Sequence, residues 1–425
     1  MELNVAALCG RKISCSCGRT HYCPIDTVEV SSGALKMLPG LIASCKAILL
    51  VADQNTYAAC GKAVADLIGE KLHRTLIYQR TGMLVPNEEA VAELEAALSP
   101  DIDFVIGIGS GVINDLCKYV TFNRGMEYGI IASAPSMDGY ASSGAAMIMG
   151  GMKITYATRP PKWILADVDV LRLAPLDMIR SGYGDIIGKY SSLNDWRLSA
   201  LINGEYLCPE IYQLVMDTTN EIRRCAARIV EREPEAIELL TKALILIGVT
   251  LSLVETTRPG SGSEHHLSHF FEIVGLIRNE PYFLHGTDVG YSTVITAALR
   301  ERLCRIESPV PCPVPEGERL KAWERVYGDY AGEIAKIQQH FGFYDRDMAP
   351  LYSEKWPQIL DILRECPSAA EVQAMLDEAG YEKGGFEMLY GQQKIDDAIL
   401  YAKDLKERYS VLWLWWTLFG GEGNA

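Results

Sequence analysis

The sequence predicts an α/β domain in residues 1–170, followed by a mostly α-helical domain in residues 171–425. Between residues 42 and 132, short apolar runs alternate with longer segments of helical spacing, which is typical of βαβ units and a parallel sheet. The later part of the chain carries long segments of helical spacing and few strand signals. The change of pattern between residues 168 and 176 predicts the domain boundary.

The strands and helices of the first domain are expected in a regular order. We predict strands at residues 47–53, 75–78, 103–109 and 128–132, and helices at 57–68, at 88–98 and from near Val112. The runs 146–149 and 153–157 flank Gly150-Gly151 and predict a β-hairpin, after which residues 163–167 close the sheet. These elements together indicate a Rossmann-like domain.

The second domain is expected to be built from long helices, at residues 211–232, 235–255, 317–341 and 368–379. The most apolar stretch, Val411–Phe419, has nine residues and is too short to span a bilayer. We therefore expect it to form a buried terminal helix or a contact surface, and it suggests a homo-oligomer.

The composition narrows the class of function. The chain has 425 residues, is 48% hydrophobic and carries a formal net charge of −15. Such an acidic chain does not favour nucleic acid or anionic membrane as a main partner, since both normally require a basic face. We found no apolar run long enough to be a transmembrane segment and no secretory or transit signal, so we expect a cytoplasmic protein.

Twelve cysteines are spread along the chain, which in a cytoplasmic protein indicates mainly free thiols. The segment that contains Cys15, Cys17, His21 and Cys23 is more closely spaced than the rest. It could hold zinc, form an oxidation-sensitive pair or be an ordinary hairpin, and the sequence leaves these three interpretations open.

Four of the seven histidines lie between Ser261 and Gly286. In a helix, His265 and His269 would share one face, about 6 Å apart at Cβ. That spacing suits two metal ligands, or one ligand and one neighbouring base. The alternative is a helix start capped by Ser263, with the histidines as polar surface.

Glycines follow the strand predicted at residues 103–109, in the run Gly107-Ile-Gly-Ser-Gly111. Such a strand-to-helix turn lets backbone amides approach a pyrophosphate, although it is not the usual GxGxxG motif and can also be a plain tight turn. Asp53 ends the first predicted strand, where a carboxylate can bond a ribose diol. That position favours NAD over NADP without excluding NADP.

Two further segments combine acids with small residues. The run Ser133 to Gly144 follows a predicted strand, and it either holds a nicotinamide and presents Asp138 to a substrate or forms a self-bonded loop. Asp185 and Lys189 are four residues apart and either form an ion pair or perform chemistry. In the second case, Asp185 would be the carboxylate partner of the histidines in a metal site.

These motifs, in this order, resemble a known family. Gly-Ser-Gly-Val-Ile-Asn-Asp115, Ala-Pro-Ser-Met-Asp-Gly-Tyr-Ala-Ser142, Gly-Tyr-Gly-Asp-Ile-Ile-Gly-Lys189, Ser-Gly-Ser-Glu-His-His-Leu-Ser-His269 and Leu-His-Gly286 resemble the sn-glycerol-1-phosphate dehydrogenases, particularly the bacterial, AraM-like branch. That family belongs to the iron-containing alcohol dehydrogenase and dehydroquinate synthase superfamily. The resemblance covers about residues 25–300 and implies a dehydroquinate synthase-like fold.

The resemblance also implies roles for single residues. Metal ligands would be Asp185, His265 and His285, and the substrate would contact His269, Asp138, Asp185 and Lys189. His269 and Asp138 would be the catalytic pair, and His266 would be structural. Cofactor contacts would come from Asp53, Gly109, Gly111, Val112, Ile113, Asn114, Asp115, Ser133, Ser136 and Ser142.

The implied reaction is the reversible NAD(P)-dependent reduction of dihydroxyacetone phosphate to sn-glycerol 1-phosphate. One divalent metal is implied, with zinc expected and nickel or iron(II) fitting the same ligands. The alternatives within the superfamily are a dehydrogenase for another small polyol or alcohol and a sugar-phosphate cyclase. From other classes, a metal-dependent hydrolase using His265, His269 and Glu272 or a catalytically silent nucleotide-binding protein remains open.

Overall fold

The structure is a computed structural model, and it describes residues 3–420. The chain divides into two units. Unit 1 comprises the chain up to Ile186 together with Asn220–Thr256, and unit 2 comprises Ile187–Thr219 and the chain from Thr257 onward. We had predicted two continuous domains, but a helical segment from the second half of the chain belongs to unit 1. The predicted fold class, a parallel α/β sheet domain with a mostly helical remainder, is confirmed.

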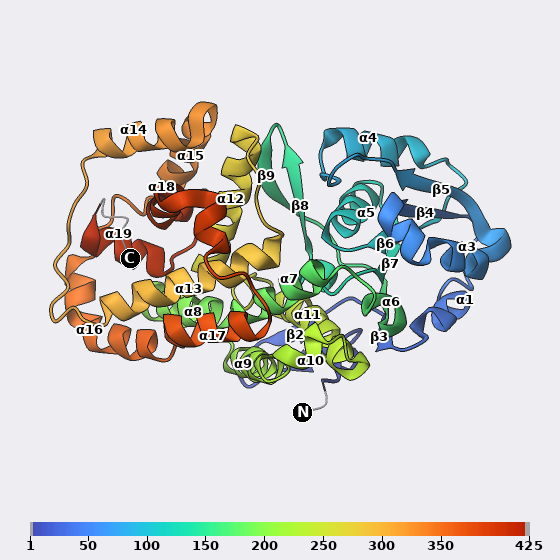
Figure 1. Cartoon of the computed structure of the whole chain (residues 1–425), viewed down its shortest axis with the longest axis horizontal. Helices are drawn as coiled ribbons and strands as arrows, with labels where there is room; N and C mark the ends of the chain where they lie inside the picture. Colours follow the sequence, from blue (N-terminus) through green and yellow to red (C-terminus); the bar gives the residue numbers. More distant parts are fainter. Residues whose placement is uncertain (1–2, 421–425) are drawn as a thin grey trace. The chain divides into compact units, whose positions relative to one another are not determined.

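Six parallel strands form the sheet of unit 1, in the order β3-β10-β7-β6-β4-β5. Figure 1 shows β4, β5, β6 and β7 in this sheet. Their bounds are β3 (Thr27–Ser31), β4 (Ile48–Asp53), β5 (Leu72–Tyr78), β6 (Phe104–Gly109), β7 (Tyr128–Ala132) and β10 (Trp163–Asp167). Five of the six were predicted. The missed strand, β3, pairs only with β10 at the edge of the sheet.

Side chains alternate between the two faces of this sheet. On one face, Leu50 and Ile106 pack with Val64 and Ile68 of α3 (Lys62–Ile68) in one buried cluster. The other face is covered by α5 (Gly111–Asn123), as the surroundings of Gly107 show: a Cβ there would lie 3.1 Å from Cys117 Sγ. Both faces are therefore covered, which explains why the central strands are continuously apolar.

Smaller elements complete the first part of unit 1. They are η1 (Val5–Leu8), η2 (Ala34–Met37), α1 (Leu38–Leu41), α2 (Gln54–Thr56), α4 (Glu88–Ala97), η5 (Gly139–Ala141) and α6 (Val168–Leu171). The hairpin predicted around Gly150-Gly151 is confirmed as β8 (Gly144–Met149) paired antiparallel with β9 (Met152–Ala157). Both glycines have positive φ, +59° and +76°, as this turn requires.

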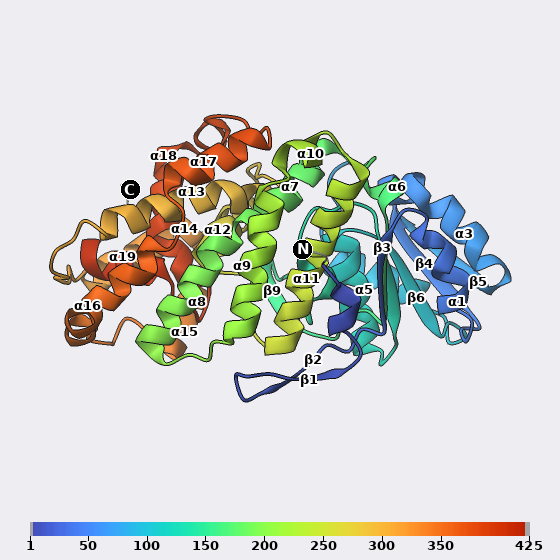
Figure 2. The same ribbon diagram turned by 90° about the horizontal axis from the view of Figure 1, so that it is seen from below.

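A second hairpin lies near the N-terminus, where β1 (Lys12–Ser14) pairs antiparallel with β2 (Thr20–Tyr22). Figure 2 shows it as a narrow ribbon that extends beyond the sheet. The cysteine-rich segment therefore forms a hairpin, and this arrangement is compatible with each of its three interpretations.

The segment that returns to unit 1 contains α10 (Ala226–Val230) and α11 (Pro234–Val254). By length and composition, α11 is the one helix in the described part of the chain that could cross a membrane, and 83% of its most apolar window is buried in the structure. We had not recognised it as a candidate span because Glu235, Glu238 and Lys242 interrupt its first half. Its burial identifies it as a core helix of the fold.

The helices that lie wholly in unit 2 are α8 (Lys189–Asn203), α12 (Ser263–Arg278), α13 (His285–Leu303), α14 (Glu316–Tyr327), α15 (Ala331–Phe341), α16 (Ala349–Arg364), α17 (Ala369–Glu378), α18 (Gly385–Tyr401) and α19 (Val411–Phe419). Two helices, α7 (Leu176–Ile187) and α9 (Pro209–Arg223), cross from one unit to the other. The single helix predicted over 317–341 is interrupted at Gly328, whose φ is +56°.

The apolar C-terminal segment forms α19 and is buried inside unit 2. Leu412, Leu414 and Trp415 have no exposed surface. Its indole-rich face contacts cationic side chains, with the guanidinium of Arg302 5.2 Å from the ring centre of Trp415. The interpretation as a buried terminal helix is therefore confirmed.

Candidate active site

In unit 1, the loop after β7 is tied to α7 by two hydrogen bonds. The hydroxyl of Ser181 donates to the carbonyl oxygen of Ser136 at 3.0 Å, and the amide of Asp138 donates to Oδ2 of Asp185 at 2.9 Å. Asp185 has no exposed surface. The structure thus brings together two segments predicted separately as functional, with one carboxylate from each.

Glycines allow this close approach. A Cβ on Gly182 of α7 would lie 1.9 Å from the carbonyl oxygen of Pro135, which no side chain could tolerate. On α11, a Cβ on Gly248 would lie 2.7 Å from the carbonyl oxygen of Asp138. The loop is therefore clamped between two helix backbones, and the Asp138 side chain does not cap η5.

The predicted phosphate-binding turn lies at a point where the strand order reverses. β4 and β6 are neighbours, but the chain continues from β4 to β5 on one side and from β6 to β7 on the other. Their carboxyl ends carry Asp53 and Gly109. In open α/β sheets, ligands bind in the crevice at such a reversal, so both residues stand where a dinucleotide would be expected.

The start of α5 offers backbone donors. Ser110 is the N-cap and makes no side-chain cap hydrogen bond, so the amides of Gly111, Val112 and Ile113 lie at the positive end of the helix dipole. A Cβ on Gly109 would lie 2.4 Å from Cβ of Ile113, so the turn needs glycine there. The geometry fits an anion held by backbone amides.

Other predicted cofactor residues have structural partners. Asn114 is buried, donates to the carbonyl oxygen of Gly139 at 3.2 Å and accepts from the Tyr128 hydroxyl at 3.0 Å. Asp53 caps α2 by accepting the amides of Asn55 and Thr56, both at 2.8 Å. These hydrogen bonds hold the side chains of Asn114 and Asp53 against other residues of unit 1.

A buried lysine joins two further predicted residues. The ammonium of Lys118 lies 3.3 Å from Asp115 Oδ1 and donates to Ser142 Oγ at 3.2 Å. Burial lowers the pKa of Lys118 and raises the pKa of Asp115, and the ion pair opposes both shifts. Lys118 was not predicted, because nothing in its helical spacing separates it from an exposed lysine.

The other two predicted serines lie in the loop after β7. Ser133 and Ser136 are 8% and 7% exposed, and the amide of Ser133 donates to the carbonyl oxygen of Gly109 at 3.1 Å. The loop and the glycine turn are therefore adjacent at the ends of β6 and β7.

In unit 2, three histidines form one cluster. The ring centres of His265 and His269 are 6.1 Å apart, those of His265 and His285 are 5.1 Å apart, and those of His269 and His285 are 5.3 Å apart. His265 and His269 share a face of α12, as predicted, and His285 begins α13. His265 is 4% exposed, whereas His269 and His285 are more accessible.

The Nδ1 atoms of two of these rings are held by neighbouring side chains. His265 Nδ1 lies 2.7 Å from Glu264 Oε1, and His285 Nδ1 lies 3.2 Å from the hydroxyl of Ser268. Burial raises the pKa of Glu264, but the contact with His265 and the hydrogen bonds from Gly262 and Ser191 together hold that pKa below its ordinary value. A carboxylate accepts only, so Nδ1 of His265 carries the proton and Nε2 is the basic nitrogen.

Glu264 and Ser268 were missed as functional residues. The signal was present in the sequence, since each directly precedes a histidine in Glu264-His265 and Ser268-His269. Ser268 instead meets the distant His285, which only the packing of α12 against α13 reveals. Such partners orient metal-binding histidines in many proteins.

The N-terminus of α12 is anchored by a buried acid. Asp195 of α8 accepts the amide of Ser263 at 2.6 Å and pairs with Arg300 at 2.8 Å. Neither member of this ion pair is more than 2% exposed at the side chain. This anchor fixes the turn of α12 that carries His265.

Two other predicted residues are buried nearby in unit 2. His266 has no exposed surface, and burial holds its pKa well below the ordinary value, so its ring stays neutral. Lys189 is also fully buried and donates to the carbonyl oxygen of Gly260 at 2.9 Å. Lys189 thus supports the segment before α12, and its contact with a substrate phosphate stays a prediction.

The donor chemistry fits a divalent metal. Asp185, His265 and His285 each offer one ligand atom, and those of the two histidines lie within 4.8 Å of each other. Two imidazoles and a carboxylate suit zinc, nickel or iron(II). Nδ1 of each ring contacts a neighbouring side chain, so Nε2 is the ring nitrogen turned away from that side chain, as metal ligation requires.

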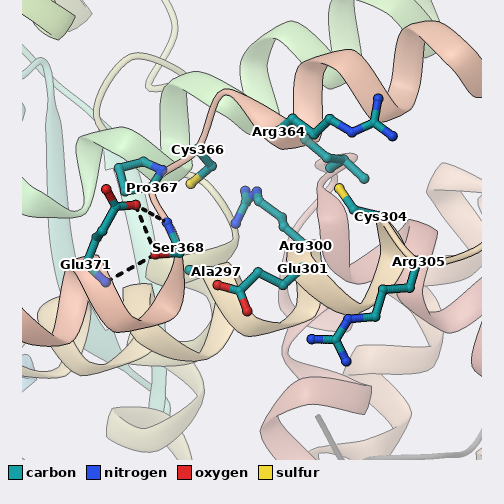
Figure 3. Close-up of a pocket in the computed structure, with 11 residues that line it drawn as sticks. Ala297, Arg300, Glu301, Cys304, Arg305, Arg364, Cys366, Pro367, Ser368 and Glu371 are labelled. Atoms are coloured by element: carbon teal, nitrogen blue, oxygen red, sulfur yellow. Dashed lines mark hydrogen bonds between the residues drawn. The ribbon is translucent and has the colours of Figure 1, made fainter.

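A separate pocket of about 410 Å³ lies in unit 2 and contains none of the predicted site residues (Figure 3). The arginines in its lining are Arg300, Arg305 and Arg364. Arg300 is already paired with Asp195, and Arg364 lies 3.4 Å from Asp361. Glu301 and Glu371 also line the pocket, which therefore carries charges of both signs.

The chain was compared with known proteins. A family model of iron-containing alcohol dehydrogenases matches residues 29–175. A protein of Bacillus licheniformis named glycerol-1-phosphate dehydrogenase (NAD(P)+) is 31% identical over 74% of this chain and 83% of its own length. A protein of the same name from Halalkalibacterium halodurans is 29% identical over 94% of each chain.

Solved structures share the fold. The crystal structure of a probable glycerol dehydrogenase from Sinorhizobium meliloti matches with a TM-score of 0.54 at 17% sequence identity, over 84% of this chain and 95% of that one. At this identity the match concerns the fold alone. The sequence relatives show that the chain belongs to the glycerol-1-phosphate dehydrogenase family of oxidoreductases, which has the iron-containing alcohol dehydrogenase fold.

Proposed function

We propose that this protein catalyses the reversible reduction of dihydroxyacetone phosphate to sn-glycerol 1-phosphate, using NADH or NADPH and one divalent metal ion. The relatives named glycerol-1-phosphate dehydrogenase support the reaction class. The structural observation that carries the proposal is the cluster of His265, His269 and His285, with Nδ1 of His265 and of His285 held by neighbouring side chains.

Asp185, His265 and His285 are the proposed metal ligands, with zinc expected and nickel or iron(II) as alternatives. A bound divalent metal supplies a Lewis acid for the ketone oxygen and for the negative charge that develops there. The side chains that prepare the site are Glu264 and Ser268, which orient the two rings.

Reduction of the ketone adds a hydride at the carbonyl carbon and a proton at its oxygen. His269 is the proposed proton donor, directly or through water, because its imidazole is accessible and its ring stacks 5.3 Å from that of His285. Asp138 is proposed to orient a substrate hydroxyl, with its backbone held by Asp185. The buried Lys189 is the proposed partner of the substrate phosphate.

The nucleotide supplies the hydride. Its pyrophosphate is proposed to lie against the segment Gly109–Asp115, where the α5 amides point outward from the helix start. Asp53 is proposed to bond the ribose, and its negative charge favours NADH over NADPH. Ser133, Ser136 and Ser142 are proposed for the nicotinamide side, since the loop that carries them adjoins the glycine turn.

The competing proposals are a dehydrogenase for another small polyol and a sugar-phosphate cyclase. The test is NADH consumption by metal-reconstituted protein, with dihydroxyacetone phosphate compared with free dihydroxyacetone. We expect kcat/KM to be at least about tenfold higher for the phosphorylated ketone, since a bound phosphate is worth more than one charge-assisted hydrogen bond. Equal turnover of the free ketone would favour the polyol dehydrogenase. Conversion of a 3-dehydroquinate precursor, supplied in a parallel assay, without net NADH consumption would favour the cyclase.

We further propose that the protein works in the cytoplasm as a homo-oligomer. The acidic composition and the metabolic relatives support the first part. The second part follows from the apolar composition of residues 411–419 alone, and the burial of α19 inside unit 2 does not add to it. Light scattering of the purified protein tests it, and a mass equal to the 47.0 kDa chain would contradict it.

A further inference from the structure

The turn between β1 and β2 brings two thiols and an imidazole together. The amide of Cys15 donates to the carbonyl oxygen of Arg19 at 3.1 Å, and the amide of Gly18 donates to that of Cys15 at 3.1 Å. Gly18 has φ of +83°, so the turn is tight and needs glycine. Cys15 and Cys17 lie in this turn, and His21 follows on β2.

The spacing of these side chains matches zinc coordination. The ligand atoms of Cys15, Cys17 and His21 lie within 4.8 Å of one another, and Cys17 Sγ is 3.5 Å from His21 Nε2. Zinc–sulfur and zinc–nitrogen bonds of about 2.3 and 2.0–2.1 Å, arranged tetrahedrally, put a sulfur and a nitrogen ligand about 3.5–3.6 Å apart. The observed separation therefore matches that of two ligands of one ion, as well as that of a hydrogen bond between the thiol and the imidazole.

The imidazole is oriented as a metal ligand. His21 is 3% exposed, and its Nδ1 lies 2.6 Å from the carbonyl oxygen of Leu253 on α11. A carbonyl oxygen only accepts, so Nδ1 carries the proton and Nε2 presents its lone pair toward Cys17. A backbone carbonyl at Nδ1 is a common means of fixing a zinc-bound histidine.

We propose that Cys15, Cys17 and His21 bind one structural zinc ion, distinct from the metal proposed at the histidine cluster. All three residues lie in the β1–β2 hairpin of unit 1, and their ligand atoms lie close together. Two thiolates and one imidazole are ligand types of structural zinc sites, in which the ion serves the fold rather than a substrate.

The ligand types separate the two sites experimentally. Thiolates release zinc when an organomercurial reagent blocks them, whereas a site of two imidazoles and a carboxylate has no thiolate to block. The experiment uses the full-length, zinc-reconstituted protein with a colorimetric zinc chelator. We expect about one equivalent of mercurial-released zinc per chain. No mercurial-released zinc would overturn the proposal.

Substituted proteins show which residues bind the released zinc. Cys17→Ser and His21→Ala should lose the mercurial-released equivalent, whereas Cys312→Ser, which alters an exposed thiol elsewhere, should keep it. Unchanged release from Cys17→Ser would overturn the proposal.

Cobalt(II) in the unaltered protein gives an answer even if these variants fail to fold. An intense thiolate-to-cobalt charge-transfer band with tetrahedral ligand-field bands supports the site. A cobalt spectrum without a sulfur band, or a disulfide between Cys15 and Cys17 in the protein isolated under reducing conditions, contradicts it.

Discussion

Oδ2 of Asp185 accepts a hydrogen bond of 2.9 Å from the backbone amide of Asp138. The bond joins α7, which carries Asp185, to the loop after β7, which carries Asp138. The family resemblance implies that Asp185 binds the metal and that Asp138 contacts the substrate. Because one oxygen of Asp185 is committed to an amide, the carboxylate has a fixed orientation.

Asp185→Asn should abolish metal binding at the histidine site. Asparagine can still accept the Asp138 amide, so the loop is kept, but the negative charge that a divalent cation requires is lost. We expect kcat/KM for dihydroxyacetone phosphate to fall by at least about 100-fold. Metal content and kinetics measure this. Asp177→Asn, at an 81% exposed side chain on the same helix, is the matched control and should leave both unchanged.

Glu264→Gln should weaken metal binding without unfolding the protein. The substitution keeps the size of a fully buried side chain but replaces the acceptor that fixes Nδ1 of His265. We expect the metal dissociation constant to rise about 10–100-fold. Equilibrium titration with zinc checks this, with Glu280→Gln on the exposed segment after α12 as control. An unchanged dissociation constant would show that Glu264 only fills space.

Gly182→Ala should displace the loop that carries Asp138. Its new Cβ would lie 1.9 Å from the Pro135 carbonyl oxygen, so α7 or the loop must move. We expect a loss of stability of about 1–3 kcal/mol, as for other overpacked sites, together with reduced kcat. Gly332→Ala on α15 has no atom within 4 Å of the new Cβ and should be neutral or slightly stabilising. Urea unfolding and steady-state kinetics compare the two.

Some strands and helices of the fold were predicted from the sequence, and others were missed. The strand 128–132 and the Gly109–Gly111 turn were predicted because an apolar run and glycines are local signals. β3 was missed because it has only five residues and precedes the run of alternating strands and helices, although its Thr-Val-Glu-Val-Ser alternation is itself a strand signal. The break at Gly328 was missed because helical spacing continues on both sides of it.

Some residues of the candidate site were also predicted from the sequence, and others were missed. Its histidines stand out by type and spacing, so they were predicted from the sequence. Ser268 partners a histidine 17 residues away, and Lys118 is recognisable only by its burial. Contacts of this kind depend on how helices pack, which the local pattern does not encode.

The free energy of unfolding should decrease as the pH rises above neutrality. Burial raises the pKa of Cys366 to about 11, and burial raises the pKa of both Tyr282 and Tyr352 to about 12. In the unfolded chain these groups ionise at lower pH, near about 8.5 and 10. Their stabilising contribution is therefore complete below about pH 8.5 and is lost as pH rises through 11–12.

Urea midpoints at intervals from pH 8 to 11 measure this loss. Cys366→Ala should flatten the decline above pH 9, whereas Cys312→Ala, at an exposed thiol, should follow the unaltered protein. An identical decline in both variants would mean that Cys366 does not contribute to it.

The configuration of the product tests the central claim most directly. Metal-reconstituted protein is supplied with NADH and dihydroxyacetone phosphate, and the glycerol phosphate formed is then offered to an enzyme specific for sn-glycerol 3-phosphate. The proposed activity predicts a product that this enzyme does not oxidise, formed only when metal is present. A product that is oxidised, or equal product from metal-free protein, would contradict it.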